Sequence, residues 1–97
     1  MFIISLTYKQ SNAEVDKYID SHRIFLTKFY AAGVFIMSGR KQPRTGGIIL
    51  AKAQNLASLE QIIQQDPFYI HQLADYEITE FLPSKSISEL SHLLLER

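Results

Sequence analysis

The 97-residue sequence predicts one α+β domain in which strands and helices follow one another in the order β-α-β-β-α-β. Two observations lead to this prediction. Strands are indicated by apolar side chains at every second position near both ends of the domain, and by a glycine-rich hairpin signal in its middle. Helices are indicated by apolar side chains at three- and four-residue spacing between those strands.

The first strand and the first helix are marked by their periods and their ends. Along residues 2–8 one face is strongly apolar and consists of Phe2, Ile4, Leu6 and Tyr8. Ser11 and Glu14 have the spacing of a capping box, in which each side chain accepts a hydrogen bond from the other residue's backbone N–H. Gly33 stands where the left-handed residue that ends a helix belongs. We therefore expect one continuous helix over residues 12–32.

The second half of the domain predicts a hairpin, a shorter helix and a last strand. Apolar segments 34–37 and 47–51 flank a connection rich in glycine, proline and arginine, which is typical of two hairpin strands. Helical spacing follows at Leu56, Leu59, Ile62 and Ile63. Asp66 and Pro67 end that helix and begin one further turn. The last strand shows the alternation of Ala74, Tyr76 and Ile78 with polar residues.

This order of elements predicts the ferredoxin-like arrangement, in which one antiparallel sheet carries both helices on the same face. Residues 35–37 and 48–50 are nevertheless apolar on both faces of their strands, as in strands that are covered on both sides. Because the helices cover one face only, we expect a second copy of the sheet to cover the other face by two-fold symmetry. The sequence therefore predicts a homodimer with its sheets face to face.

His22 lies on the apolar face of the predicted first helix, in line with Val15, Ile19, Phe25, Leu26 and Phe29. A titratable side chain there needs a polar partner, and Asp66 is the candidate. Such a carboxylate would orient the imidazole and leave its other nitrogen to move a substrate proton as a general acid or base. Two structural interpretations stay open. His22 is a core histidine with one hydrogen bond, or Asp66 is the N-cap of the turn that Pro67 begins.

The hairpin connection is a candidate anion site. It places three cations, Arg40, Lys41 and Arg44, beside glycines that let a ligand approach backbone N–H groups closely. This combination suits a carboxylate or a phosphate. The alternative is a solvated hairpin whose glycines serve its turns, and the pattern alone favours that alternative. The pattern of a P-loop is missing from the sequence, so we do not expect a nucleoside triphosphate as the ligand.

Composition narrows the classes of function. Ten Lys and Arg balance ten Asp and Glu, so neither a nucleic acid nor an anionic membrane is the expected partner. The chain has no cysteine, which excludes catalysis by a thiolate. The absence of cysteine is also consistent with a protein of the reducing cytoplasm. His22, His71 and His92 match no recurrent ligand spacing, so we expect no metal site. The first residues are interpreted as a strand rather than a signal peptide, and no apolar run has membrane-spanning length.

Several short motifs together resemble the YciI-like, or YCII-related, family over about residues 1–83. In chain order they are His22-Arg23-x-Phe25-Leu26, Ser38-Gly39-Arg40, Pro43-Arg44-Thr45-Gly46-Gly47, Asp66-Pro67-Phe68 and Ala74-x-Tyr76-Glu77-Ile78-x-Glu80-Phe81. The resemblance implies a ferredoxin-like domain, dimers of the α/β-barrel type, and a His/Asp pair that maps onto His22 and Asp66. It also implies substrate contacts that map onto Ser38, Arg40, Arg44, Gly46 and Gly47.

The chemistry that the resemblance implies is of the lyase or isomerase type. We therefore expect a cytoplasmic homodimeric enzyme that needs no cofactor and acts on a small anionic substrate, such as a lactone or an unsaturated acid. The alternative is a non-catalytic dimeric module that binds a small ligand or regulates another process.

The end of the chain departs from the family pattern. Residues 1–83 form the predicted domain, and residues 84–97 form a C-terminal extension. Ser86 and Glu89 have the capping-box spacing again, and they precede Leu90, Leu93 and Leu94 at helical spacing. The sequence therefore predicts a short amphipathic helix that folds over its own domain, reaches across the dimer, or joins dimers into a higher oligomer.

Overall fold

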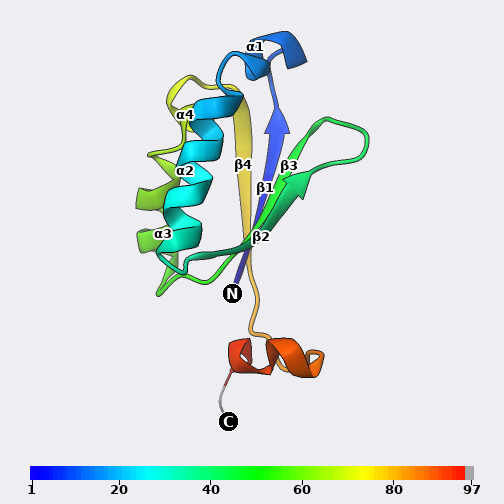
Figure 1. Ribbon diagram of the computed structural model, residues 1–97, viewed down its shortest axis with the longest axis vertical. Helices are drawn as coiled ribbons and strands as arrows, with labels where there is room; N and C mark the ends of the chain where they lie inside the picture. The colour runs from blue at the N-terminus through cyan, green and yellow to red at the C-terminus, as the bar shows by residue number, and fades with distance from the viewer. Residues whose placement is uncertain (96–97) are drawn as a thin grey trace.

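The structure, a computed structural model, describes residues 1–95 and consists of a four-stranded antiparallel sheet with its helices on one face (Figure 1). The last two residues of the predicted extension lie outside the described residues. In chain order the elements are β1 (Phe2–Tyr8), α1 (Asn12–Asp16), α2 (Ile19–Ala31), β2 (Phe35–Arg40), β3 (Gly46–Ala51), α3 (Leu56–Ile63), α4 (Pro67–Ile70), β4 (Ala74–Glu80) and the 3-10 helix η1 (Ser88–Leu93).

The strands lie in the order β2-β3-β1-β4, and all neighbours are antiparallel. Ile4 of β1 is paired with Ile49 on one side and with Ile78 on the other, so the apolar alternation of the three strands is in register. This arrangement confirms the predicted ferredoxin-like fold. No helix within residues 1–95 is both long enough and apolar enough to cross a membrane.

The core lies between the sheet and the helices. β1 contributes Phe2, Ile4 and Leu6 to it, as its alternation predicted. The remaining buried apolar residues come from the other three strands, from all four α-helices and from the turn before β4. They are Val15, Phe25, Phe29, Phe35, Ile49, Ala51, Leu59, Ile63, Phe68, Leu73 and Ala74. Gly33 has a φ of 75°, the left-handed conformation expected after the first helical region.

The predicted first helix is divided in two. Helix α1 ends at Asp16, and Tyr18 has a φ of −116° and a ψ of 7°, outside the helical region. The capping box is also only half formed. The Ser11 side chain accepts a hydrogen bond from the Glu14 backbone N–H, but the Glu14 carboxylate pairs with Lys17 instead of returning to Ser11. The ring of Tyr18 stacks on His71, with 4.1 Å between the centroids, so a tertiary contact holds the break.

The hairpin and the C-terminal segment also differ from the predictions. β2 continues to Arg40, which shortens the connection to residues 41–45. The predicted amphipathic helix is a 3-10 helix without a buried residue, closed by bonds from Leu90 N–H to the Ile87 carbonyl and from Leu94 N–H to the Ser91 carbonyl. The second capping box is not formed, because the Ser86 hydroxyl donates to the Ile87 carbonyl. Without a surface to pack against, little stabilises an α-helix this short.

Candidate active site

His22 is held on the inner face of α2 and is 8% exposed. Its imidazole stacks on the Phe68 ring, with 3.9 Å between the centroids and 2° between the planes. Phe68 lies in the first turn of α4, and its ring fixes the plane of the His22 imidazole, which projects from α2. The expected position of His22 among apolar neighbours is therefore observed.

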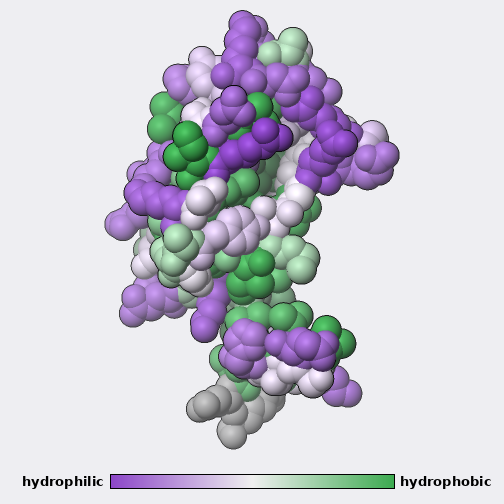
Figure 2. Space-filling model, viewed as in Figure 1, coloured by the Kyte–Doolittle hydropathy of each residue, from purple (hydrophilic) through white to green (hydrophobic). Residues whose placement is uncertain are grey.

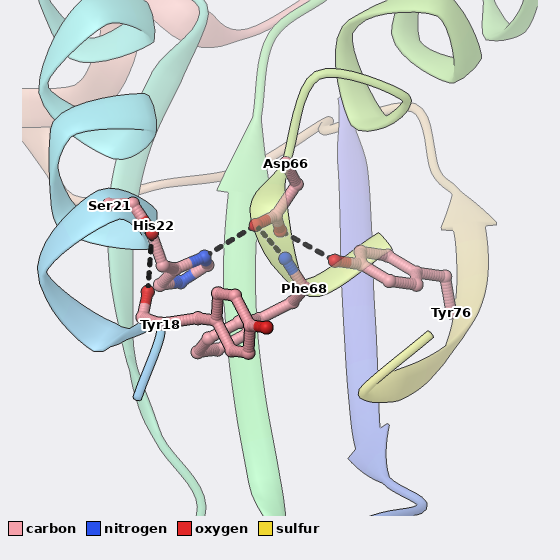
Figure 3. A network of polar contacts seen from close by, with 6 residues as sticks. All are labelled: Tyr18, Ser21, His22, Asp66, Phe68 and Tyr76. Carbon is pink, nitrogen blue, oxygen red and sulfur yellow. Dashed lines mark hydrogen bonds and ion pairs between the residues drawn. The ribbon is translucent and has the colours of Figure 1, made fainter. Parts of the chain in front are cut away.

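Asp66 is fully buried and receives three hydrogen bonds (Figure 3). Its Oδ1 accepts from His22 Nδ1 at 2.7 Å and from the Phe68 backbone N–H at 3.0 Å. Its Oδ2 accepts from the Tyr76 hydroxyl at 2.5 Å. The bond to Phe68 N–H is the N-cap of α4, so the capping role and the pairing with His22 are present in the same carboxylate.

The contacts of Asp66 decide which nitrogen of His22 holds the proton. A carboxylate only accepts hydrogen bonds, so the facing Nδ1 is the donor, and in a neutral imidazole the lone pair then lies on Nε2. Within residues 1–95 every buried polar side-chain atom has a hydrogen-bond partner. Nε2 has no such partner, so it is accessible to solvent, and His22 lines a cavity.

This cavity lies between α2 and the β2–β3 hairpin and has a volume of about 490 Å³. This is the size of pocket that takes a small molecule. Hydrophilic side chains border its opening in Figure 2. Its lining residues are Leu6, Tyr8, Asp16, Ile19, His22, Arg23, Leu26, Ser38, Gly39, Arg40, Arg44, Gly46, Gly47, Ile48, Ile49 and Phe68.

The cations near this cavity differ in their partners. Arg44 is bound to the Asp16 carboxylate, and this ion pair connects the hairpin with the end of α1. The hydrogen bond from Arg44 lowers the pKa of Asp16, and the same bond raises the pKa of Arg44. Arg23 Nη1 lies 3.6 Å from Asp20 Oδ1. Within the described residues Arg40 forms no ion pair. Lys41 does not line the cavity, and its Nζ donates to the Thr7 hydroxyl.

The other predicted contact residues also line the cavity. Ser38 is held by a hydrogen bond of 2.6 Å between its hydroxyl and that of Tyr30. Gly46 has a packing reason to be glycine, because an added Cβ would lie 1.7 Å from the Leu6 carbonyl oxygen. The Gly46 carbonyl accepts from Lys41 N–H, so its backbone serves the hairpin. The strand ends of the hairpin therefore line the cavity, and Gly46 allows β3 to pack closely against β1.

The sequence did not identify Tyr76 as a member of this polar network. The alternation of the last strand predicts a core aromatic ring whose hydroxyl is able to reach a polar site, and the structure shows that this hydroxyl donates to Asp66. Burial first, and then the negative charge of Asp66, raise the pKa of Tyr76 above its ordinary value. Tyr76 therefore remains a hydrogen-bond donor at neutral pH.

The other histidines lie apart from this network. The His71 ring stacks on Tyr18, and His92 lies in η1. Among the residues that the structure describes, no three His, Cys, Asp or Glu side chains are grouped so that they could hold a metal ion.

Comparison with known proteins supports the fold and the family. The solved structure of 5-chloro-2-hydroxyhydroquinone dehydrochlorinase (TftG) from Burkholderia phenoliruptrix AC1100, in complex with 2,5-dihydroxybenzoquinone, is similar with a TM-score of 0.74. The similarity covers 86% of this chain and 94% of that chain at 15% sequence identity, so it shows a shared fold. No curated protein matches the sequence significantly. The family profile of the YCII-related domain matches residues 1–82, and the chain therefore belongs to the YCII-related domain family.

Proposed function

We propose that the protein is a cofactor-independent enzyme in which His22 acts as the general base on a small anionic substrate. One observation carries the proposal. His22 Nδ1 donates to the buried Asp66 carboxylate at 2.7 Å, the opposite nitrogen is accessible, and His22 lines a cavity of about 490 Å³. An imidazole oriented by a fixed carboxylate is suited to general acid–base catalysis.

The proposed step begins with a C–H bond made acidic by a neighbouring carbonyl or carboxylate group. The proton moves to Nε2, and the electron pair of the C–H bond forms a carbon–carbon double bond. In a lyase the leaving group on the neighbouring carbon departs with its bonding pair, and Nε2 then releases the proton to the leaving group or to water. In an isomerase the carbonyl π pair moves onto its oxygen to give an enolate, and this pair returns to the carbonyl as Nε2 gives the proton to another carbon of the same substrate. The negative charge of Asp66 stabilises the imidazolium formed between these events.

The surroundings of the cavity favour an anionic substrate. Within residues 1–95 Arg40 has no carboxylate partner, so it can face a substrate carboxylate. Arg23 of α2 also lines the cavity, and its pair with Asp20 is long, at 3.6 Å, and exposed. Arg44 is less available because Asp16 already binds it. The lining combines these groups with Leu26 and Phe68, which suits a compact, partly apolar acid or lactone. Loss of HCl from a ring, the reaction named for the structural neighbour, is one elimination of this kind.

We also propose a homodimer through the open face, meaning the surface of the sheet that carries no helix. Ile3, Met37 and Ile48 are exposed there, while Ile4 and Ile49, which follow Ile3 and Ile48 in their strands, are buried under the helices. Leu50 of β3 is paired with Ile3 of β1 on one side and with Met37 of β2 on the other, so these apolar side chains are contiguous. A second copy would cover the same set of residues by two-fold symmetry. Sedimentation of a monomer at micromolar concentration would contradict this proposal.

The proposed function is tested by turnover of a panel of small lactones, unsaturated acids and halogenated ring acids. We expect His22→Gln and Asp66→Asn to lower kcat by about 10²–10⁴-fold, the usual contribution of a general base. His71→Gln is the matched control, because His71 stacks on Tyr18 outside the cavity. If wild-type protein binds panel members without converting any of them, the protein is a ligand-binding module. If His22→Gln retains full turnover, His22 is not the base.

A further inference from the structure

We propose that Tyr76 is a positioning residue of the site, because its hydroxyl holds the Asp66 carboxylate in the one orientation that presents Oδ1 to His22 Nδ1. The inference rests on the proposed function, in which Nε2 of His22 is the base. It adds a third side chain to the pair and assigns it a role that does not involve contact with the substrate.

The hydrogen bonds of Asp66 divide unequally between its two oxygens. Oδ1 accepts from His22 and from the Phe68 backbone, whereas Tyr76 is the donor recorded for Oδ2 within residues 1–95. A carboxylate turns readily about its terminal torsion, because that torsion has a broad minimum. The contact with Tyr76 therefore restrains this rotation from the side opposite His22, as Figure 3 shows.

The strand that carries Tyr76 makes this restraint a rigid one. Tyr76 lies in β4 opposite Leu6 of β1, in the middle of seven consecutive residue pairs. Its ring also packs edge-to-face against Tyr69, with 5.7 Å between the centroids. Since its pKa is raised, the hydroxyl keeps its proton and remains a donor to Asp66. His22, Asp66 and Tyr76 thus come from α2, the start of α4 and β4, and each element fixes one member.

Tyr76 acts from outside the proposed substrate cavity. It lines a second cavity, together with Tyr69 and residues near the start of β4, while His22 lines the first. Asp66 lies between the two side chains and is itself fully buried. Removing the Tyr76 hydroxyl should therefore change the orientation of His22 without removing a substrate contact. This separation distinguishes a positioning residue from a catalytic residue.

The experiment compares Tyr76→Phe with wild type by NMR of protein labelled with ¹⁵N at histidine. In wild type we expect the Nδ1–H tautomer of His22 to dominate, with a downfield Nδ1–H proton signal protected from exchange with water. In Tyr76→Phe we expect the second tautomer to appear and the Nδ1–H proton to exchange about tenfold faster or more. Tyr69→Phe is the matched control, since it removes a neighbouring hydroxyl that has no recorded bond to Asp66.

Three results would separate the possibilities. If a folded Tyr76→Phe keeps the wild-type tautomer and exchange rate, Tyr76 only packs in the core and the inference is wrong. If Tyr76→Phe changes the tautomer in an Asp66→Asn background as much as in wild type, Tyr76 does not act through Asp66, which also overturns it. Where a substrate is turned over, a lower kcat with an unchanged KM supports positioning. The tautomer measurement needs no turnover, so failure of the proposed function would be seen separately.

Discussion

Two regions of this molecule reverse the usual distribution of polar and apolar side chains. Around Asp66 an ionisable network lies inside the domain, and Asp66 itself is 0% exposed. In the C-terminal arm, defined here as residues 84–95, large apolar side chains lie outside the domain. They are Ile87, Leu90 and Leu95, with exposures between 37% and 64%.

The two reversals are compensated in different ways. The buried carboxylate receives three hydrogen bonds from its own chain, so its burial is balanced within the monomer. The arm extends away from the domain in Figure 1, and in Figure 2 apolar surface gathers where it leaves the domain. η1 buries none of its residues against the domain. The comparison teaches that one region is complete in a single chain, while the other leaves its apolar side chains exposed in the single chain.

The largest expected effect comes from emptying the buried network. Asp66→Ala leaves Nδ1 of His22, the Phe68 N–H and the Tyr76 hydroxyl without their acceptor. We expect the free energy of unfolding to fall by about 3–5 kcal/mol, as when one partner of a buried pair is removed. Urea unfolding measures this loss. Asp75→Ala, at an exposed pair with Lys9, should cost less than about 1 kcal/mol. Equal losses at both positions would contradict the importance of the buried network.

A second large effect is expected where β3 packs against β1 at the cavity. In Gly46→Ala the added Cβ meets the Leu6 carbonyl at 1.7 Å, so the two strands must separate. We expect a loss of about 3 kcal/mol in the free energy of unfolding. In Gly39→Ala the added Cβ meets no atom within 4 Å, and we expect a change below about 1 kcal/mol. Thermal unfolding of the two variants makes the comparison, and a mild Gly46→Ala would show that the hairpin adapts.

The arm is expected to matter for assembly and little for the folding of one chain. Truncation after Ser84 removes η1, in which no residue is buried, so the monomer should lose less than about 0.5 kcal/mol in unfolding free energy. If the arm packs on a second copy, the truncated protein sediments as a smaller species than the full chain. An unchanged oligomer would exclude a role of the arm in assembly. Ser91→Ala, which leaves the apolar side chains in place, is the control.

The smallest expected effect concerns the exposed pair of Asp16 and Arg44. The hydrogen bond from Arg44 lowers the pKa of Asp16 in the folded protein. A lowered carboxyl pKa stabilises the protein above the unfolded-state pKa of about 3.9, and this contribution is lost as the pH falls through the folded-state value. Wild type should therefore exceed Asp16→Asn slightly in stability at pH 7 and lose that advantage in strong acid. Glu60→Gln, on the exposed side of α3, is the control for the removal of a surface carboxyl group.

The sequence predicted the fold well because its signals are local. Alternation along β1, the N-cap at Asp66 and the left-handed Gly33 each depend on a few consecutive residues, and the structure shows all three. Predictions failed where a distant contact competed with a local preference. Tyr18 breaks the first helix where it stacks on His71, and the leucines of the arm lack the packing surface that an α-helix there would need.

The candidate site shows the same division. The sequence by itself determined that a histidine lies on a buried helix face, that an aspartate begins the turn after Gln65, and that Tyr76 points inward. Only the tertiary structure decided that these side chains meet, because His22 and Asp66 are 44 positions apart and Tyr76 comes from another strand. Hydrogen-bond geometry depends on how α2, α4 and β4 pack, and no local period records that packing.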